Sequence, residues 1–143
     1  MIALTGNILL LFALLSSILT IIFAKIPAIN SDKKYKFTCL FGLFQFLFIL
    51  FSYILLTYGF IISDFSLVTV WQNSEIQKPF VYKITGVWGN HEGSILLWLL
   101  ILSICLFFII KYDKNIPRSV LLNTITVQTS IIFAFLVFII LVL

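Results

Sequence analysis

The run Ser94–Ile110, SILLWLLILSICLFFII, decides the fold, because its 17 residues include no charged side chain. Three further runs lack charge in the same way: Ile2–Ala24, Phe37–Ile62 and Ser119–Leu143. About 20 apolar residues cross a hydrocarbon core of ~30 Å at ~1.5 Å per residue, so each run is predicted to be a transmembrane helix. The run from Ser94 is short for a crossing, and we expect its helix to begin a few residues earlier.

The composition of the whole chain supports this interpretation. Of its 143 residues, 62% are hydrophobic and 10% are charged, and the mean hydropathy is +1.22. Soluble domains carry roughly 25% charged residues. The apolar runs do not alternate with polar residues, which excludes a β-barrel. The sequence therefore predicts an all-α membrane protein, one membrane domain over residues 1–143, with transmembrane helices at about 2–24, 37–62, 90–110 and 119–143.

The basic residues indicate how the chain is oriented. They gather in two short loops, which hold Lys25, Lys33, Lys34, Lys36 and then Lys111, Lys114, Arg118. The long loop at 63–93 holds only two lysines, against three acidic residues. Because basic loops stay on the cytoplasmic or matrix side, both termini and the long loop are predicted to lie on the outer side. This topology explains the pI of about 9.2 without nucleic-acid binding.

Within the long loop, residues 64–70 alternate as a short extended segment would, and residues 71–74 are typical of a turn. Pro79 disfavours a helix that crosses it. Irregular loops of this length are usually functional or docked on a partner.

The membrane runs carry few chemical groups. None has a mid-membrane ionisable residue of the kind that pumps and transporters use, which argues against autonomous ion transport. Cys39 and Cys105 belong to no CxxC or CxxCH pattern, so neither a redox couple nor covalently attached haem is expected, and no metal site is predicted. A polar group in the last run, Asn123, Thr126, Gln128 and Thr129, is expected to hydrogen-bond a neighbouring helix.

Polar residues concentrate instead at positions 88–98, WGNHEGSILLW. Gly89 and Gly93 allow a sharp turn, and Ser94 is placed to cap the following helix. His91, the only histidine, has two open interpretations. A neutral imidazole could ligate haem iron or a metal, or it could be a structural residue hydrogen-bonded to Glu92 or to a neighbouring helix. A lone histidine makes an incomplete ligand set.

The two tryptophans of this stretch also allow two interpretations. Trp88 and Trp98 could belong to the aromatic belt at the membrane surface. Trp98, however, lies deep in the predicted span, where an indole needs a partner for its N–H group or a flat surface on which to pack.

The run Val81–Trp98 closely resembles the N-terminal region of CcmF, the haem lyase subunit of cytochrome c maturation, whose signature is W-G-x-H-E-G-S-x-L-L-W. Every fixed position of the signature is filled. Weaker matches stand in the same order at Gly6-Asn7, at Ser63-Asp64-Phe65 and at Asn73-Ser74. The resemblance covers essentially the whole chain.

The resemblance implies a subunit of the haem lyase that ligates haem to apocytochrome c and that is not catalytic alone. CcmF proteins are several times longer and carry a tryptophan-rich WWD segment and haem-holding histidine pairs, which this sequence lacks. We therefore expect the amino-terminal fragment of a split CcmF, with haem b ligated mainly by other chains. No catalytic residue is assigned. The haem-facing or supporting candidates are Trp88, Gly89, His91, Glu92, Gly93, Ser94 and Trp98.

The expected partners are other CcmF fragments that carry the WWD segment, a haem chaperone, apocytochrome c and membrane lipid. A bias toward Phe, Ile, Leu, Lys and Asn is typical of AT-rich coding and favours the mitochondrial inner membrane, with both termini in the intermembrane space. A bacterial inner membrane is the alternative. The alternative function is that of a non-catalytic scaffold subunit in a larger membrane complex, such as a respiratory complex.

Overall fold

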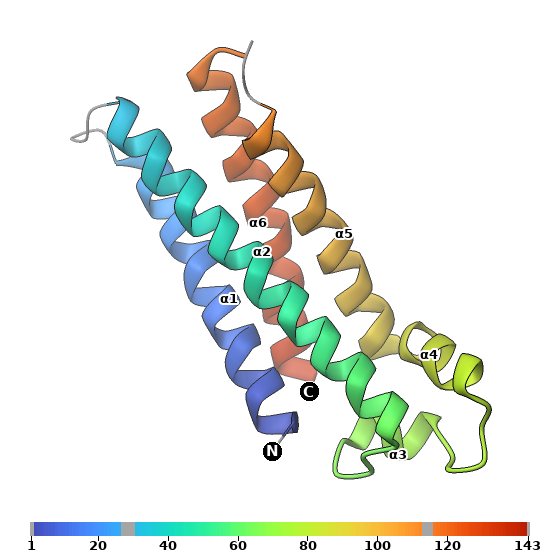
Figure 1. Cartoon of the computed structure of the whole chain (residues 1–143). Coiled ribbons are helices and arrows are strands. Elements are labelled where there is room, and N and C mark those ends of the chain that lie inside the picture. Colours follow the sequence, from blue (N-terminus) through green and yellow to red (C-terminus); the bar gives the residue numbers. More distant parts are fainter. Residues whose placement is uncertain (1, 27–30, 113–115, 143) are drawn as a thin grey trace.

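The computed structural model describes residues 2–26, 31–112 and 116–142. Four long helices form an antiparallel bundle (Figure 1): α1 (Ile2–Lys25), α2 (Ser31–Ile62), α5 (His91–Lys111) and α6 (Arg118–Val142). Each is long and apolar enough to cross a membrane. Helices α1 and α5 each pack against both α2 and α6. The predicted all-α fold with four transmembrane helices is confirmed.

Two helix starts test the expected boundaries. Helix α5 begins at His91, inside the polar stretch, as expected from the short apolar run. Helix α2 begins at Ser31, six residues before the predicted start at Phe37. Lys33, Lys34 and Lys36, which the sequence placed in a loop, therefore lie in the first turns of α2. Lysine favours helix, and a helix that protrudes from lipid into water need not be apolar there.

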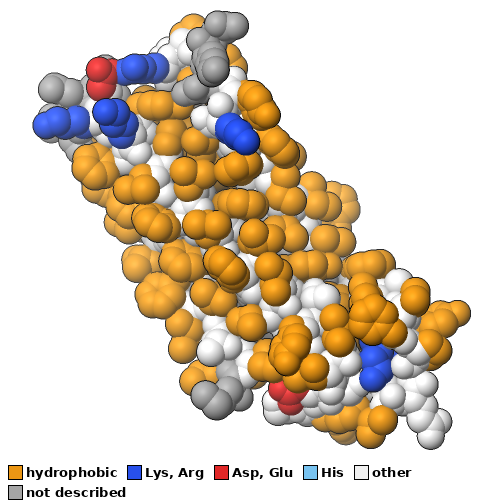
Figure 2. Space-filling model, viewed as in Figure 1, with side chains coloured by type: hydrophobic (Ala, Val, Ile, Leu, Met, Phe, Trp, Pro, Cys, Tyr) orange, Lys and Arg blue, Asp and Glu red, His pale blue; other side chains and the backbone are white. Residues whose placement is uncertain are grey.

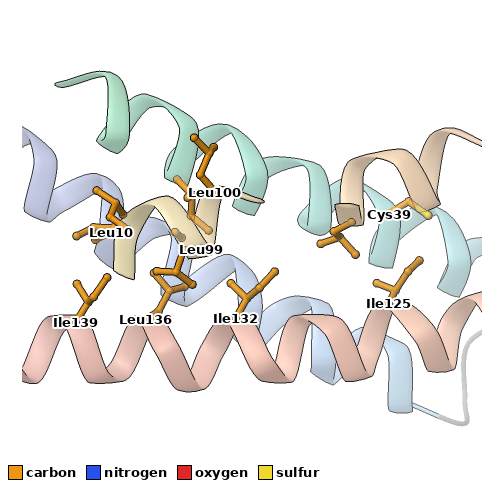
Figure 3. Packing of buried hydrophobic residues seen from close by; sticks show 12 residues of the cluster. Leu10, Cys39, Leu99, Leu100, Ile125, Ile132, Leu136 and Ile139 are labelled. Atoms are coloured by element: carbon orange, nitrogen blue, oxygen red, sulfur yellow. The ribbon is translucent and has the colours of Figure 1, made fainter. Parts of the chain in front are cut away.

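The interior of the bundle follows a repeat of three and four residues. In α6 the buried positions are Leu121, Ile125, Thr129, Ile132, Leu136 and Ile139, and in α1 they include Leu10, Ala13, Ser17, Thr20 and Ala24. Figure 3 shows side chains of several helices meeting along this seam. The spacing is that of helices that cross at a shallow angle, as in most bundles. Small and weakly polar residues on the inner face let the backbones approach closely.

Each long helix has a fully buried polar side chain toward its middle; these are Ser17, Gln45, Ser103 and Thr129. Both serines donate to carbonyls of their own helix, Ser17 to Leu14 at 2.6 Å and Ser103 to Leu99 at 2.8 Å. The Gln45 amide and the Thr129 hydroxyl have no hydrogen-bond partner among the described residues.

The polar group predicted in the last span divides between two roles. Gln128 donates from Nε2 to the Leu102 carbonyl of α5 at 3.1 Å, so the expected bond between helices is confirmed for this residue. Thr126 donates to Leu122 of its own helix at 2.6 Å, and Asn123 is exposed. The outward position of Asn123 and the local bond of Thr126 differ from the expectation.

The charges separate toward the two ends of the molecule. Figure 2 shows Lys and Arg side chains gathered at the end where α1 joins α2. At that end Arg118 of α6 pairs with Asp32 of α2, and its guanidinium carbon lies 5.8 Å from the centre of the Tyr35 ring. Lys114 and Leu143 lie outside the described residues. The start of α1 and the end of α6 lie at the opposite end, together with the segment between α2 and α5 (Figure 1).

That segment, residues 63–90, is called the connector below. The predicted long loop contains two short helices, α3 (Val68–Asn73) and α4 (Phe80–Trp88). The extended segment predicted at 64–70 and the turn predicted at 71–74 are therefore both wrong. Helix α4 begins directly after Pro79, as the restriction on proline requires.

The connector is helical because its apolar residues pack inward on the end of the bundle. Val70 of α3 and Val87 of α4 are fully buried with Phe60 of α2. A turn leads into this arrangement: the Asp64 N–H donates to the Gly59 carbonyl at 2.9 Å, and Ser63 has a positive φ of 56°. The apolar residues at 64–70 that suggested a strand thus include the buried side of the short helix α3.

Candidate functional site

The turn from α4 to α5 is held by Asn90, which is the N-cap residue of α5. Its Oδ1 accepts from the Gly93 N–H at 2.7 Å, and its Nδ2 donates to the carbonyls of Gly86 at 2.9 Å and Val87 at 3.1 Å. One amide therefore closes the first turn of α5 and the last turn of α4. The expectation that Ser94 caps this helix is wrong.

Ser94 also links α5 to the end of α4. Its hydroxyl donates to the Trp88 carbonyl at 2.6 Å. Gly93 is buried, and a Cβ atom there would overlap the Val87 carbonyl. A glycine is thus required at 93 for close approach of the two helices.

Gly89 contributes less than the sequence suggested. It ends α4 with a φ of −77°, and its N–H donates to the Thr85 carbonyl at 3.2 Å. No glycine within the described residues has a positive φ. The turn is sharp because of the Asn90 bonds, and not because a glycine adopts a left-handed conformation.

Glu92 connects α5 to α3. Its carboxylate accepts a hydrogen bond from the hydroxyl of Thr69, whose side chain is 6% exposed. Sequence reasoning missed Thr69, because a threonine between two valines is typical of a strand. A hydrogen bond between Glu92 and His91 was one of the alternatives for His91, and the structure gives Glu92 a bond to Thr69.

Beneath this contact lies a cavity of about 70 Å³ at the connector end of the bundle. Its polar lining comes from Gly6 and Asn7 of α1, Ser52 of α2, Thr69 and Glu92. The Ser52 hydroxyl donates to the Gly6 carbonyl at 3.5 Å, and a Cβ on Gly6 would meet nothing within 4 Å. The cavity thus brings the Gly6-Asn7 pair next to the Glu92 carboxylate, which is 86 or 85 residues away in sequence.

His91 lies apart from this cavity. It is the first residue of α5 and is exposed. Among the described residues, no three His, Cys, Asp or Glu side chains lie close enough together to hold a metal ion. The imidazole is thus accessible, and it belongs to no such group within the part of the chain that the structure describes.

The two tryptophans both face outward. The side chain of Trp88 is 45% exposed, and that of Trp98 is 64% exposed on α5. Trp98 therefore does not pack inside this bundle, and its ring is available to lipid or to another protein surface.

The weaker matches to the family at residues 63–65 and 73–74 lie in the connector, where two lysines bond to them. Lys83 donates from Nζ to the Ser63 hydroxyl at 2.6 Å, and Lys78 donates to the Asn73 carbonyl at 3.0 Å. The Ser66 hydroxyl and N–H groups lower the pKa of the Asp64 carboxyl from its ordinary value by hydrogen bonding to its charged form.

Part of the chain is similar in sequence to known proteins. The chain is 51% identical over 79 residues to the cytochrome c-type biogenesis protein CycK of Rhizobium meliloti, and 33% identical over 78 residues to the cytochrome c-type biogenesis protein CcmF of Escherichia coli. These matches take in 55% and 54% of this chain but only 12% of each relative. No family model matches the chain.

The fold has a counterpart among solved structures. A cytochrome c haem lyase CcmF aligns with 95% of this chain at a TM-score of 0.86, with 24% sequence identity. The alignment occupies 23% of that longer protein, and at this identity it speaks for the fold. From the sequence matches and the shared four-helix arrangement, this chain is homologous to a part of the CcmF and CycK proteins of cytochrome c-type biogenesis.

Proposed function

We propose that these 143 residues form one part of a haem lyase that attaches haem to apocytochrome c. The observation that carries the proposal is the α4–α5 turn. Its residues match the CcmF signature and are fixed by a dense set of hydrogen bonds through Asn90, Ser94 and Glu92. The relatives named above are cytochrome c-type biogenesis proteins.

The role of the turn follows from its rigidity. Enzymes that join two large substrates gain rate by holding them in a fixed geometry. The turn presents the exposed His91 and Trp88 on a backbone that the buried Gly93 and the Glu92–Thr69 bond hold in place. We assign His91 to contact with haem or with a neighbouring haem-holding segment, and Glu92, Gly93 and Ser94 to support, while Trp88 stays in the candidate set as the last residue of α4. Gly89 and Trp98 complete the candidate set at its edges.

The described residues do not fit an independent haem site. A haem iron held by two imidazoles needs a second histidine, and the chain has one. The ligands of a resident haem b are therefore assigned to segments outside these 143 residues, and no chemical step is derived through the haem here. The haem supplies the vinyl groups of the reaction, and this chain supplies positioning.

The proposed setting follows from the same features. Four apolar helices and the bacterial relatives support a multi-pass protein of an inner membrane. The basic end, with Arg118 and the lysines of α2, would face the matrix or cytoplasm, and the connector would face the side on which haem and apocytochrome c meet. A mitochondrial inner membrane, with both termini in the intermembrane space, is the specific proposal. The partners are segments with a WWD run, a haem chaperone and apocytochrome c.

Purification of the native complex through this chain in mild detergent tests the proposal. Mass spectrometry should find a WWD-bearing protein in the sample, and the absorption spectrum should show haem. A sample that contains only respiratory-chain subunits and no haem would refute the haem lyase and favour the second candidate, a scaffold subunit. That candidate is supported by the incomplete ligand set around His91.

A further inference from the structure

Helix α4 lies at the end of the bundle, directly before the start of α5. Figure 1 shows it projecting from the start of α5, away from α1 and α6, and its contacts are with α2 and α5. Two residues, Gly89 and Asn90, separate the last residue of α4, Trp88, from the first residue of α5, His91. The depth of α4 is thus fixed by the end of a membrane-spanning helix.

The two sides of α4 differ in what they contact. Val87 is fully buried against Phe60 and Val70, and a Cβ on Gly86 would lie 3.4 Å from the Phe60 ring. An adjoining side carries Val81, which is 66% exposed, and Trp88, which lies seven residues later on the same side of the helix. Phe80 and Tyr82 add exposed rings to the first turn. A short helix outside the hydrophobic core of the bundle therefore presents an apolar, aromatic face to its surroundings.

We propose that this face of α4 is inserted in the membrane interface, where it anchors the α4–α5 turn at the level of the lipid headgroups. Amphipathic helices with Trp and Phe on one face bury that face at the boundary between headgroups and acyl chains. Tryptophan and tyrosine are enriched at this depth. The proposal does not depend on haem lyase activity.

The lipid-facing surface of α5 continues into this face. Trp98 and Ile101 of α5 are 64% and 48% exposed on a helix that is long and apolar enough to cross the membrane. Where lipid covers that surface, it also reaches the start of α5 at His91, seven residues before Trp98, and with it the end of α4. Continuity with this surface favours lipid over a water-soluble partner as the occupant.

Spin labelling of the full chain in phosphatidylcholine–phosphatidylglycerol liposomes tests the proposal. Single cysteines are placed by Val81→Cys on α4, Gln72→Cys on the exposed part of α3 and Ile101→Cys on α5, with Cys39 and Cys105 replaced by alanine. The label at 81 should be relaxed by oxygen more strongly than by a water-soluble nickel complex, at a depth between those of the labels at 72 and 101. A nickel response equal to that at 72, or protection from both reagents by a protein surface, would overturn the proposal.

A second measurement needs no cysteine-free background. Brominated lipids quench nearby tryptophans, and the chain has three. Trp88→Phe should remove most of the quenching by bromines placed near the headgroups, whereas Trp71→Phe should leave it. Equal effects of the two substitutions would contradict an interfacial α4.

Discussion

The hydroxyl of Thr69 donates to the carboxylate of Glu92, and this bond joins α3 to the first turn of α5 across 23 residues of sequence. It fixes the connector to the helix that carries the signature residues. Glu92 also lies in the first turn of its helix, where the dipole favours a negative charge. The contact gives the acidic residue of the motif a structural role in addition to any chemical one.

Removal of this bond should loosen the connector. Thr69→Val keeps the shape of the side chain but leaves the carboxylate without its donor. A hydrogen bond to a charged group contributes about 1.5–3 kcal/mol. Amide hydrogen exchange in α3 and α4 should therefore accelerate by roughly tenfold or more, while exchange in α1 stays the same. The matched control is Thr85→Val on α4, whose hydroxyl bonds only its own helix at 3.3 Å. Equal acceleration by both variants would contradict the role given to the bond.

Gly6 and Gly93 should respond oppositely to substitution by alanine. A Cβ at Gly93 overlaps the Val87 carbonyl, whereas a Cβ at Gly6 meets open space. Gly93→Ala should therefore separate α4 from α5 and reduce the amount of folded chain in membranes severely. Gly6→Ala should accumulate like the natural protein, because alanine also favours helix over glycine by about 1 kcal/mol. Quantitative immunoblotting of membranes and thermal denaturation in detergent measure both effects, and normal accumulation of Gly93→Ala would show that the helices do not approach so closely.

Asn90 should be the most sensitive polar residue of the turn. Asn90→Ala removes the N-cap bond and both donations to α4, and loss of a cap alone costs about 1 kcal/mol. Asn90→Asp keeps the acceptor for Gly93 but loses the two donors to Gly86 and Val87. The melting temperature should fall in the order natural protein, Asp variant, Ala variant. An Asp variant as unstable as the Ala variant would mean that the donations to α4 outweigh the cap.

Gln45 offers a test of the membrane interior. Its amide is fully buried, and neither of its polar atoms has a partner among the described residues. A buried polar group without a partner costs about 1–3 kcal/mol. Gln45→Leu should therefore raise the thermal stability of the chain in detergent, with Gln128→Leu, which breaks the bond to Leu102, lowering it. A destabilising Gln45→Leu would indicate that an internal water or another segment hydrogen-bonds the amide.

The membrane helices were predictable because crossing a membrane imposes length and apolar composition, which the sequence displays directly. Which face of each helix points inward was not predictable from hydrophobicity. The lipid-facing side, with residues such as Phe51 and Phe138, is as apolar as the core. The buried face is marked instead by small and weakly polar residues such as Ser17 and Thr20, a signal that a hydrophobicity pattern does not contain.

The contacts within the candidate site could not be predicted from the sequence. The crowding of His91, Glu92 and the tryptophans into one stretch is what made these residues candidates. The partner of Glu92 was missed because Thr69 reaches it only after the connector folds back on α2. The capping role was given to Ser94 rather than Asn90, because a helix that starts at the first apolar residue would begin later than α5 does.

His91 provides the direct test of the proposed function. It is exposed at the start of α5, so His91→Ala should leave the fold intact. If the imidazole contacts haem or a haem-holding segment, the amount of holocytochrome c should fall by tenfold or more, while the variant chain still accumulates and still copurifies with its partners. The matched control is Gln72→Ala, an exposed residue of α3 that lies outside the signature. Unchanged holocytochrome c in the His91 variant would remove this side chain from the site and leave the turn with a structural role only. A fall in holocytochrome c that is accompanied by loss of the partners would assign His91 to assembly of the complex and not to haem.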